Sequence, residues 1–212
     1  MFLPSAARYL FSFLLVMTPI FSEHAFLDQK GKEIRIVPVT SIEDIDLVRG
    51  KDILVRGFMV GYENVPLAEL NPAFKSIGDV KRFYERYFDS ELEHYQHGEL
   101  IWVQAFEGTR LLGWATFALE PFEKDAAYMN LLVVDPNEQG RGIGRHLTFS
   151  ICSRDLYPHI NAINLLIRKV NEGGRKFYER LGFSDFQYTI RDNFVDTSLL
   201  TGLRWAEKPS NE

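Results

Sequence analysis

Leu131 to Arg145 reads LLVVDPNEQGRGIGR, and this stretch decides the fold. An apolar run typical of a buried β-strand leads through Asp135 and Pro136 into a glycine-rich loop, after which the sequence turns helical. Glycine has no side chain, so a ligand can lie against the backbone of such a loop. The first turn of a helix presents unpaired N–H groups and the positive end of the helix dipole, which favour anions. The stretch predicts either a pyrophosphate site or a glycine-rich turn without a ligand.

A second strand-to-helix junction follows further along the chain. The run AINLLIRKV, from Ala162 to Val170, reads as another buried strand, and NEGGRKFYERLGF continues from Asn171 to Phe183. Together the two junctions resemble the GNAT superfamily of acetyl-CoA-dependent N-acetyltransferases. They match its Gln/Arg-x-x-Gly-x-Gly/Ala and Asn…Phe-Tyr-x-x-x-Gly-Phe motifs at Gln139, Gly142, Gly144, Asn171, Phe177, Tyr178, Gly182 and Phe183. The clear resemblance covers Leu100 to Tyr188, and a weaker similarity extends from Glu33 to the C-terminus.

The resemblance implies a mixed α/β (α+β) fold, in which helices flank a central, mostly antiparallel sheet. The hydrophobic pattern agrees, because strand-like segments alternate with helical stretches after Thr40, over 79–95 and from 142 to about 157. Strands are predicted over 33–39, 100–106, 111–119, 128–134, 162–170, 183–190 and 199–207. An antiparallel meander thus precedes a βαβ unit, whose parallel strands need a crossover helix. The resemblance also implies that the sheet splays between its fourth and fifth strands, and that pantetheine fills the gap.

Acetyl-CoA is the cosubstrate that the resemblance implies, and most of the matched loop would contribute backbone groups to it. The N–H groups of 139–144 would hold the pyrophosphate. Arg141 and Arg145 would add positive charge, the alternative being solvated cations at a helix start. Pantetheine would meet backbone groups of two strand residues, and Asn171 would bond its amide or cap the following helix. The predicted cofactor-binding residues are Leu132, Val134, Gln139, Gly140, Arg141, Gly142, Ile143, Gly144, Arg145 and Asn171.

Tyr178 is the predicted catalytic residue, since it matches the family tyrosine proposed to donate a proton to the leaving thiolate. A thiol pKa of about 8.5 lies below the value of about 10 for a phenol, so partial donation would suffice. The alternative is an aromatic side chain that packs the helix onto the sheet. No general base can be read from the sequence, because Tyr128, with Asn130 on the same face, stands where some family members carry a glutamate. Glu120, Asp125 and a relayed water remain as candidates.

Composition excludes several classes of function. The 212 residues suffice for one globular domain, and the net charge of −5 argues against nucleic acid as a partner. A single cysteine, Cys152, excludes an internal disulfide and is poorly placed for a covalent acyl-enzyme. His94 and His97 have metal-like spacing but lack a third ligand, so no metal is predicted.

The N-terminus is predicted to be a leader, residues 1–28, ahead of a transferase domain at 29–212. Arg8 precedes a largely apolar run from Tyr9 to Phe21, a layout typical of a signal peptide and short for a transmembrane helix. A membrane-associating segment, a start codon assigned upstream of the true one and an amphipathic extension are the alternatives. The leader favours export or membrane association, whereas the supply of acetyl-CoA favours the cytoplasm.

These features predict an enzyme that transfers the acetyl group of acetyl-CoA to a primary amine by direct attack in a ternary complex. The alternative is a non-catalytic acetyl-CoA-binding sensor or interaction module with the same fold. No motif identifies the acetyl acceptor, a small molecule or a peptide, and the protein is predicted to be a monomer or a homodimer. Aromatic side chains from the early helices and the closing strands are expected to line the acceptor pocket, namely Tyr62, Phe83, Tyr87, Phe122, Phe194 and Trp205.

Overall fold

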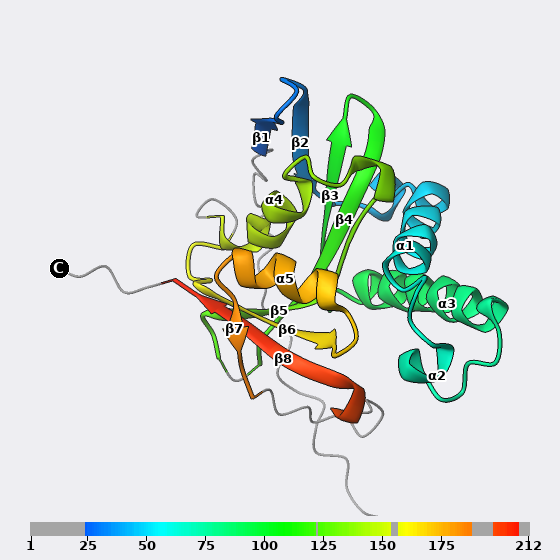
Figure 1. Cartoon of the computed structure of the whole chain (residues 1–212). Helices are drawn as coiled ribbons and strands as arrows, with labels where there is room; N and C mark the ends of the chain where they lie inside the picture. Colours follow the sequence, from blue (N-terminus) through cyan, green and yellow to red (C-terminus); the bar gives the residue numbers. More distant parts are fainter. Residues whose placement is uncertain (1–23, 122, 154–156, 188–196, 208–212) are drawn as a thin grey trace, which may run out of the picture.

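The computed structural model of this chain describes residues 24–121, 123–153, 157–187 and 197–207, which form one eight-stranded sheet covered by helices (Figure 1). The strands are β1 (His24–Leu27), β2 (Glu33–Pro38), β3 (Ile101–Glu107), β4 (Arg110–Leu119), β5 (Ala126–Val134), β6 (Ala162–Arg168), β7 (Ser184–Asp185) and β8 (Leu200–Ala206). The helices are α1 (Leu47–Gly61), α2 (Leu67–Leu70), α3 (Ile77–Gln96), α4 (Ile143–Phe149) and α5 (Glu172–Arg180). The strand order is β1-β2-β3-β4-β5-β6-β8-β7, and among the described pairs β5 and β6 alone run parallel. The predicted mixed, mostly antiparallel sheet is confirmed.

Two apolar cores hold the layers together, one on each face of the sheet. On one face α1 and α3 cover the stacked indoles of Trp102 and Trp114, whose ring centres lie 4.5 Å apart, and Phe88 meets both edge-on. On the other face α4 buries Ile143 and Leu147 against the strands, and α5 packs beside it. Burying one large apolar side chain contributes about 1.5–3 kcal/mol, so these cores fix both layers.

Helix α3 begins at Ile77, two residues before the predicted start, and packs as its hydrophobic period predicts. Ser76 and Asp79 form a capping box, in which the Asp79 carboxylate accepts from the Ser76 N–H at 2.8 Å. Tyr84 and Phe88 recur at helical spacing on the buried face. The same face continues to Glu91, a carboxylate that is only 4% exposed. An acidic residue this deeply buried requires polar partners, which bear on the site described below.

β5 and β6 separate soon after they meet. Their parallel pairing joins 126–128 to 162–164 and ends there. Close to the same point the register of β5 against β4 shifts between Thr116 and Phe117. An irregularity of this kind bends a strand, so the rest of β5 diverges from β6 and a gap opens in the sheet. The splay therefore lies between the two strands for which it was predicted.

Four segments differ from the sequence predictions. β1 lies within residues 24–28, which we assigned to the leader, and its four residues are too few to show an alternating pattern. Because β1 precedes the others, the splay falls between the fifth and sixth strands of the structure. Helix α4 ends at Phe149, where the Ser150 hydroxyl donates to the Leu147 carbonyl at 2.8 Å and a short 3-10 turn follows. The strand predicted over 183–190 is described only as β7, and α2 was not predicted.

The predicted leader lies mostly outside the described residues. Its first 23 residues therefore stay a prediction, together with the targeting that they would imply. In the described ranges no helix is long and apolar enough to cross a membrane.

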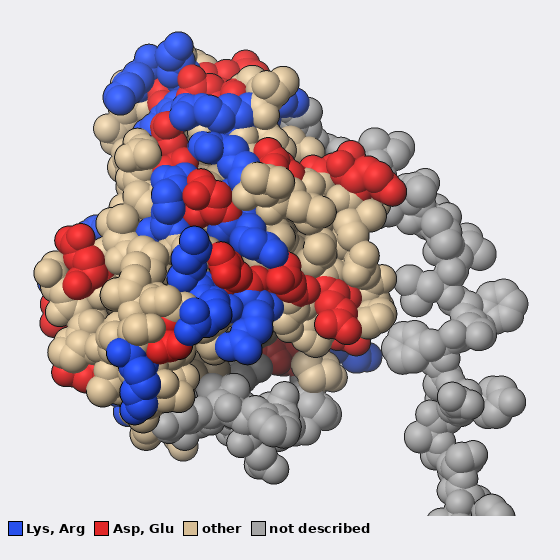
Figure 2. Space-filling view, turned by 90° about the vertical axis from the view of Figure 1, so that its right-hand side faces the viewer, with Lys and Arg blue, Asp and Glu red and all other residues tan. Residues whose placement is uncertain are grey.

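Charges of both signs are interspersed on the surface. The face in Figure 2 shows acidic and basic side chains side by side over much of its area. Local ion pairs mix the two signs along α1 and α3, as between Arg56 and Asp52 or between Arg82 and Asp79. Exposed pairs of this kind contribute little to stability, so the two cores carry most of it.

Candidate active site

The loop between β5 and α4 has the backbone that its glycines predict. Gly140 and Gly142 have φ angles of 79° and 83°, in the left-handed region where other residues are strained. Gly142 is also the N-cap of α4. Gly144 faces α5, and a Cβ built there would come within 3.1 Å of the Phe177 ring. The motif glycines therefore shape the loop and bring the two matched motifs into contact.

The side chain of Arg141 is occupied within the protein. Its guanidinium contacts the carboxylates of Asp28, Glu107 and Glu138 at 2.6, 2.8 and 2.5 Å, and only 10% of the side chain is exposed. These acids neutralise the positive charge that we predicted for the pyrophosphate. The guanidinium instead ties the glycine loop to the end of β1 and to the β3–β4 turn, which leaves the Arg141 backbone N–H for the predicted cofactor contact.

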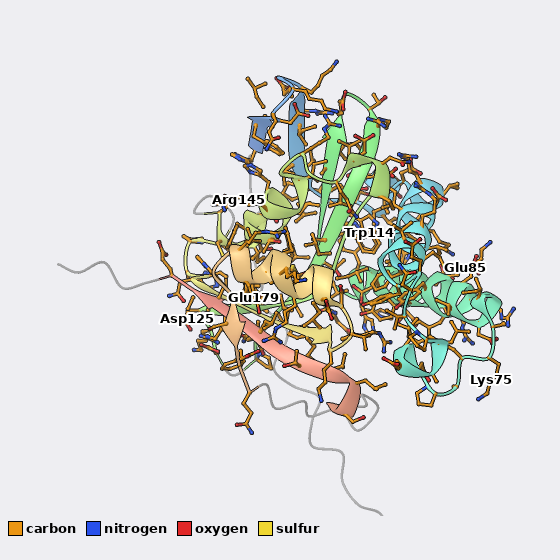
Figure 3. The ribbon with its side chains drawn as sticks, in the orientation of Figure 1. Lys75, Glu85, Trp114, Asp125, Arg145 and Glu179 are labelled. Carbon is orange, nitrogen blue, oxygen red and sulfur yellow. The ribbon has the colours of Figure 1, made fainter. Side chains whose placement is uncertain are left out.

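Arg145 lies on α4 (Figure 3). Its guanidinium carbon is 5.7 Å from the centre of the Phe149 ring. It lines a second cavity of about 370 Å³ together with His24 and His146. The structure thus gives Arg145 a packing role, and its predicted contact with the cofactor stays a prediction.

No described strand pairs with the backbone of β5 where it faces the gap. The Asp135 N–H donates to the Leu112 carbonyl at 2.8 Å, on the β4 side. Backbone groups alternate between the two sides of a strand, so those of Leu132 and Val134 point away from β4. β6 has already diverged at this level. Both predicted residues therefore present N–H and C=O groups to the gap.

A cavity of about 430 Å³ lies at this gap and reaches the face covered by α1 and α3. Residues of β5 and β6 line it together with side chains of α1, α3 and α5. It brings together three of the predicted residues, Leu132, Asn171 and Tyr178. The other tyrosines on its wall are Tyr62, Tyr84, Tyr87 and Tyr128. The cavity is thus an aromatic chamber that opens through the sheet.

Tyr178 lies on α5 at the wall of this cavity. Its ring packs edge-on against Phe183, with ring centres 5.2 Å apart. Burial raises the pKa of the Tyr178 hydroxyl, and the nearby tyrosines Tyr62 and Tyr128 add to the rise. The phenol is therefore protonated at neutral pH and can act as a hydrogen-bond donor, while its ring also packs the helix.

Asn171 caps α5, one of the two roles that the sequence left open. Its Oδ1 accepts from the Gly174 N–H at 2.9 Å. The same side chain lines the cavity and hydrogen-bonds to the Tyr62 hydroxyl. Capping thus fixes the position of an amide group at the cavity wall.

The sequence reasoning missed Glu91, the buried acid on α3. The Thr116 hydroxyl donates to its Oε2, and Tyr87 and Asn130 hydrogen-bond to the same carboxylate. Burial raises the pKa of Glu91, and the hydrogen bonds from Thr116 and Asn130 oppose the rise. Tyr87 and Asn130 both line the cavity, so Glu91 lies directly behind its wall. An acid one turn after Tyr87 on the apolar face of the predicted helix was the signal that could have revealed it.

The other suggested bases lie elsewhere. The Glu120 carboxylate accepts from the Asn164 side-chain amide at 3.0 Å, and the Asp125 carbonyl accepts the N–H groups that open β6. Neither residue lines the cavity. Figure 3 shows Asp125 near the end of β8. Burial raises the pKa of the Cys152 thiol to about 12, which keeps it protonated and unreactive.

The predicted acceptor residues divide between the two faces. Tyr62, Phe83 and Tyr87 line the cavity. Trp205 instead packs against Phe149 on the α4 face, with ring centres 5.0 Å apart. Phe122 and Phe194 lie outside the described residues. The aromatic wall of the cavity is thus formed by α1 and α3, and the described part of β8 contributes only its first residue, Leu200.

A glycine loop, a splayed pair of strands and a cavity between them define the fold and site of a coenzyme A-dependent acyltransferase. Residues 67–183, more than half of the chain, match the acetyltransferase (GNAT) family. The chain therefore belongs to this family. The L-2,4-diaminobutyric acid acetyltransferase of Halalkalibacterium halodurans is 25% identical over 79 residues, which are 37% of this chain and 42% of that protein. The match thus spans less than half of either chain.

Solved structures share the fold at low sequence identity. The PaiA N-acetyltransferase of Thermoplasma acidophilum, in complex with coenzyme A, superimposes with a TM-score of 0.62 at 16% identity. It covers 82% of this chain and 99% of its own. The ribosomal-protein-S18-alanine N-acetyltransferase of Escherichia coli gives a TM-score of 0.53 at 20% identity, covering 84% of this chain and 98% of its own. These similarities support the fold.

Proposed function

We propose that this protein transfers the acetyl group of acetyl-CoA to a primary amine by direct attack in a ternary complex. The observation that carries the proposal is the cavity at the splay, which joins Leu132 and Tyr178 on the cofactor side to the tyrosines of α1 and α3 on the other. A thioester in the gap and an amine in the chamber would meet there without a covalent intermediate on the protein. Holding two reactants together in this way can supply much of the rate enhancement.

The residues present fit acetyl-CoA. The left-handed glycines give the loop a backbone that can present N–H groups to a pyrophosphate. Pantetheine would lie along β5, where Leu132 and Val134 have free backbone groups. An N–H group at this position would also polarise the thioester carbonyl and stabilise the oxyanion formed on attack.

Residues on the two walls of the cavity could handle the two proton transfers that the reaction needs. The amine nitrogen attacks the carbonyl carbon and the carbon–sulfur bond breaks, so the amine loses a proton and the thiolate needs stabilisation. Tyr178 would donate a hydrogen bond to the departing sulfur, because its raised pKa favours the protonated phenol. The proton of the amine would pass by Tyr87, or by a water held beside Asn130, to Glu91. Glu91 thereby takes the role of the acid that is absent at Tyr128.

The acetyl acceptor is proposed to be an amine of a small molecule or of a peptide. The relative from Halalkalibacterium halodurans acts on a diamino acid, and the structural neighbour from Escherichia coli acts on an alanine of a ribosomal protein. A panel of amino acids, diamines and peptides, with thiol release as the readout, tests the proposal on the purified protein. Amine-dependent release of coenzyme A supports it.

A non-catalytic acetyl-CoA-binding module is the second candidate, favoured by Tyr128 at the position of the usual acid. Under both functions acetyl-CoA raises the melting temperature, and Gly142→Trp removes this rise by filling the loop. Thiol release that no amine accelerates would identify the binding module instead of the enzyme.

A further inference from the structure

Arg168 is the one formally charged residue among the described residues that line the cavity. It is the last residue of β6 and is partly buried. The other lining side chains are aromatic, aliphatic or amide. The chamber that would take the acetyl acceptor therefore has a positive charge at one end.

Among the described residues this arginine has no counter-charge. Its guanidinium donates to the Leu70 carbonyl and hydrogen-bonds to the Tyr84 hydroxyl, with Tyr62 close by. All these groups are neutral, and no carboxylate of the described residues pairs with Arg168. Other arginines of the chain do pair with carboxylates, namely Arg49, Arg56, Arg82, Arg110, Arg141, Arg175 and Arg204.

A guanidinium has five N–H donors in a planar fork, and the contacts above leave some of them for a ligand. A partly buried cation without a counter-ion loses hydration free energy, which a bound anion restores. One carboxylate matches one guanidinium in charge and in geometry, because both are planar and can form two parallel hydrogen bonds. A phosphate dianion would need more positive charge than this cavity contains.

A second polar group in the cavity fits the amine. Asn130 hydrogen-bonds to Glu91 through its side chain, and its Oδ1 is buried without a hydrogen-bond partner among the described residues. An unpaired buried oxygen is uncommon and accepts readily from an ammonium N–H. Because Asn130 lies on β5 at the splay, this oxygen is close to where the thioester would be held.

We propose that Arg168 binds a carboxylate of the acetyl acceptor, so that the preferred acceptors are small amines of the amino-acid class, with the amine directed to Asn130. This carboxylate site rests on one part of the proposed function, namely that the cavity binds the acetyl acceptor. Polyamines, which lack an anionic group, are then poor substrates. Peptides qualify only when they carry a carboxylate in reach of Arg168.

Matched acceptors test the proposal on the full-length protein. L-Lysine, L-lysinamide and cadaverine share the reacting amine and differ in the carboxylate. A charge-assisted hydrogen bond contributes about 1.5–3 kcal/mol, so kcat/KM for lysine should exceed that for the other two by about tenfold or more. The protein's net charge of −5 attracts the dication cadaverine more than lysine, so nonspecific electrostatic attraction would not produce a higher kcat/KM for lysine. Equal values for the three amines would overturn the proposal.

Variants at Arg168 link the preference to the residue. Arg168→Gln should abolish the preference for lysine and retain turnover of cadaverine, while Arg168→Lys should keep part of the preference. Arg180→Gln, at an exposed position of α5, is the control and should change nothing. The proposal would be overturned if the preference for lysine survived Arg168→Gln, or if kcat/KM fell equally for lysine and cadaverine. Arg168 would then have only a structural role, as the hydrogen-bond donor to the Leu70 carbonyl.

Product binding separates this proposal from the proposed activity. Calorimetry with Nε-acetyl-L-lysine and N-acetylcadaverine, on protein saturated with coenzyme A, needs no turnover. Tighter binding of Nε-acetyl-L-lysine that Arg168→Gln abolishes would support the carboxylate site even if no amine were acetylated. Equal binding, or no binding of either compound, would overturn the site whatever the activity.

Discussion

Gly144 of α4 and Phe177 of α5 are in direct contact, and through them the two family motifs pack against each other. A Cβ on Gly144 would come within 3.1 Å of the Phe177 ring and would lie 3.8 Å from the Val134 side chain. The absent side chain thus lets α4 approach α5 closely. Any residue larger than glycine at this position requires the Phe177 ring to shift.

Gly144→Val should destabilise the protein and weaken cofactor binding together. Overpacking at such a contact costs about 1–3 kcal/mol, and the displaced loop would lose its N–H groups for the pyrophosphate. Thermal unfolding with and without acetyl-CoA measures both effects. Gly173→Val is the matched control, because a Cβ at Gly173 meets nothing within 4 Å. If both variants behaved alike, the contact with Phe177 would have no such importance.

Tyr178→Phe should lower kcat and leave the affinity for acetyl-CoA unchanged. The change removes the hydroxyl that would donate to the departing sulfur and keeps the ring that packs against Phe183. Loss of one hydrogen bond in the transition state corresponds to about a tenfold decrease. Steady-state kinetics and cofactor titration provide the two readouts, with Tyr157→Phe, outside the cavity, as control. Unchanged turnover would leave Tyr178 with its packing role alone.

Arg141→Gln should reduce stability in a pH-dependent way. The Arg141 guanidinium lowers the pKa of Glu107. Because a lowered carboxylate pKa stabilises the folded state above the unfolded value of about 4, this stabilisation is present at neutral pH and is lost as pH falls through the folded-state pKa. The difference in melting temperature between wild type and variant should therefore narrow from pH 7 toward pH 3. A constant difference would mean that the ion pairs contribute nothing.

The sequence predicted the cofactor side of the site better than the acceptor side. Gly142, Gly144 and Asn171 act through local backbone geometry, namely a left-handed turn, a close approach and a helix cap, and such requirements are visible in a motif. The ion pairs of Arg141 could not be predicted, because its partners Asp28 and Glu107 are distant in sequence. Long-range pairing of this kind leaves no local pattern.

The acceptor side depends on how α1 and α3 lie across the sheet. Tyr62 and Tyr87 were expected at the acceptor pocket because they are aromatic residues of early helices, and both line the cavity. Glu91 and Arg168 were not singled out, since one looked like a break in an apolar stripe and the other like the polar end of a strand. Their significance arises only when Asn130 and Leu70 are brought to them from other elements.

Glu91→Gln should make the protein more stable and less active. Burial raises the pKa of Glu91, so its ionised form is disfavoured in the folded state, and the neutral amide removes this cost at neutral pH. In the wild type the raised pKa of Glu91 means that the protonated acid stabilises the folded state. This stabilisation is fully present below the unfolded pKa of about 4.3 and is lost as pH rises through the raised pKa of the folded state. The same carboxylate must be ionised to accept a proton, so wild-type kcat/KM should fall as pH drops through that pKa.

The variant should lose this acidic limb of the pH profile and show kcat/KM lower by about tenfold or more at neutral pH. Tyr87, His94, Thr116 and Asn130 surround the carboxylate and are unchanged, so the limb reports on Glu91. Glu85→Gln, on the outer side of α3 in Figure 3, is the control and should alter neither property. A purely structural Glu91 would give a variant that gains stability with an unchanged pH profile, and the proton path would then have to run through solvent.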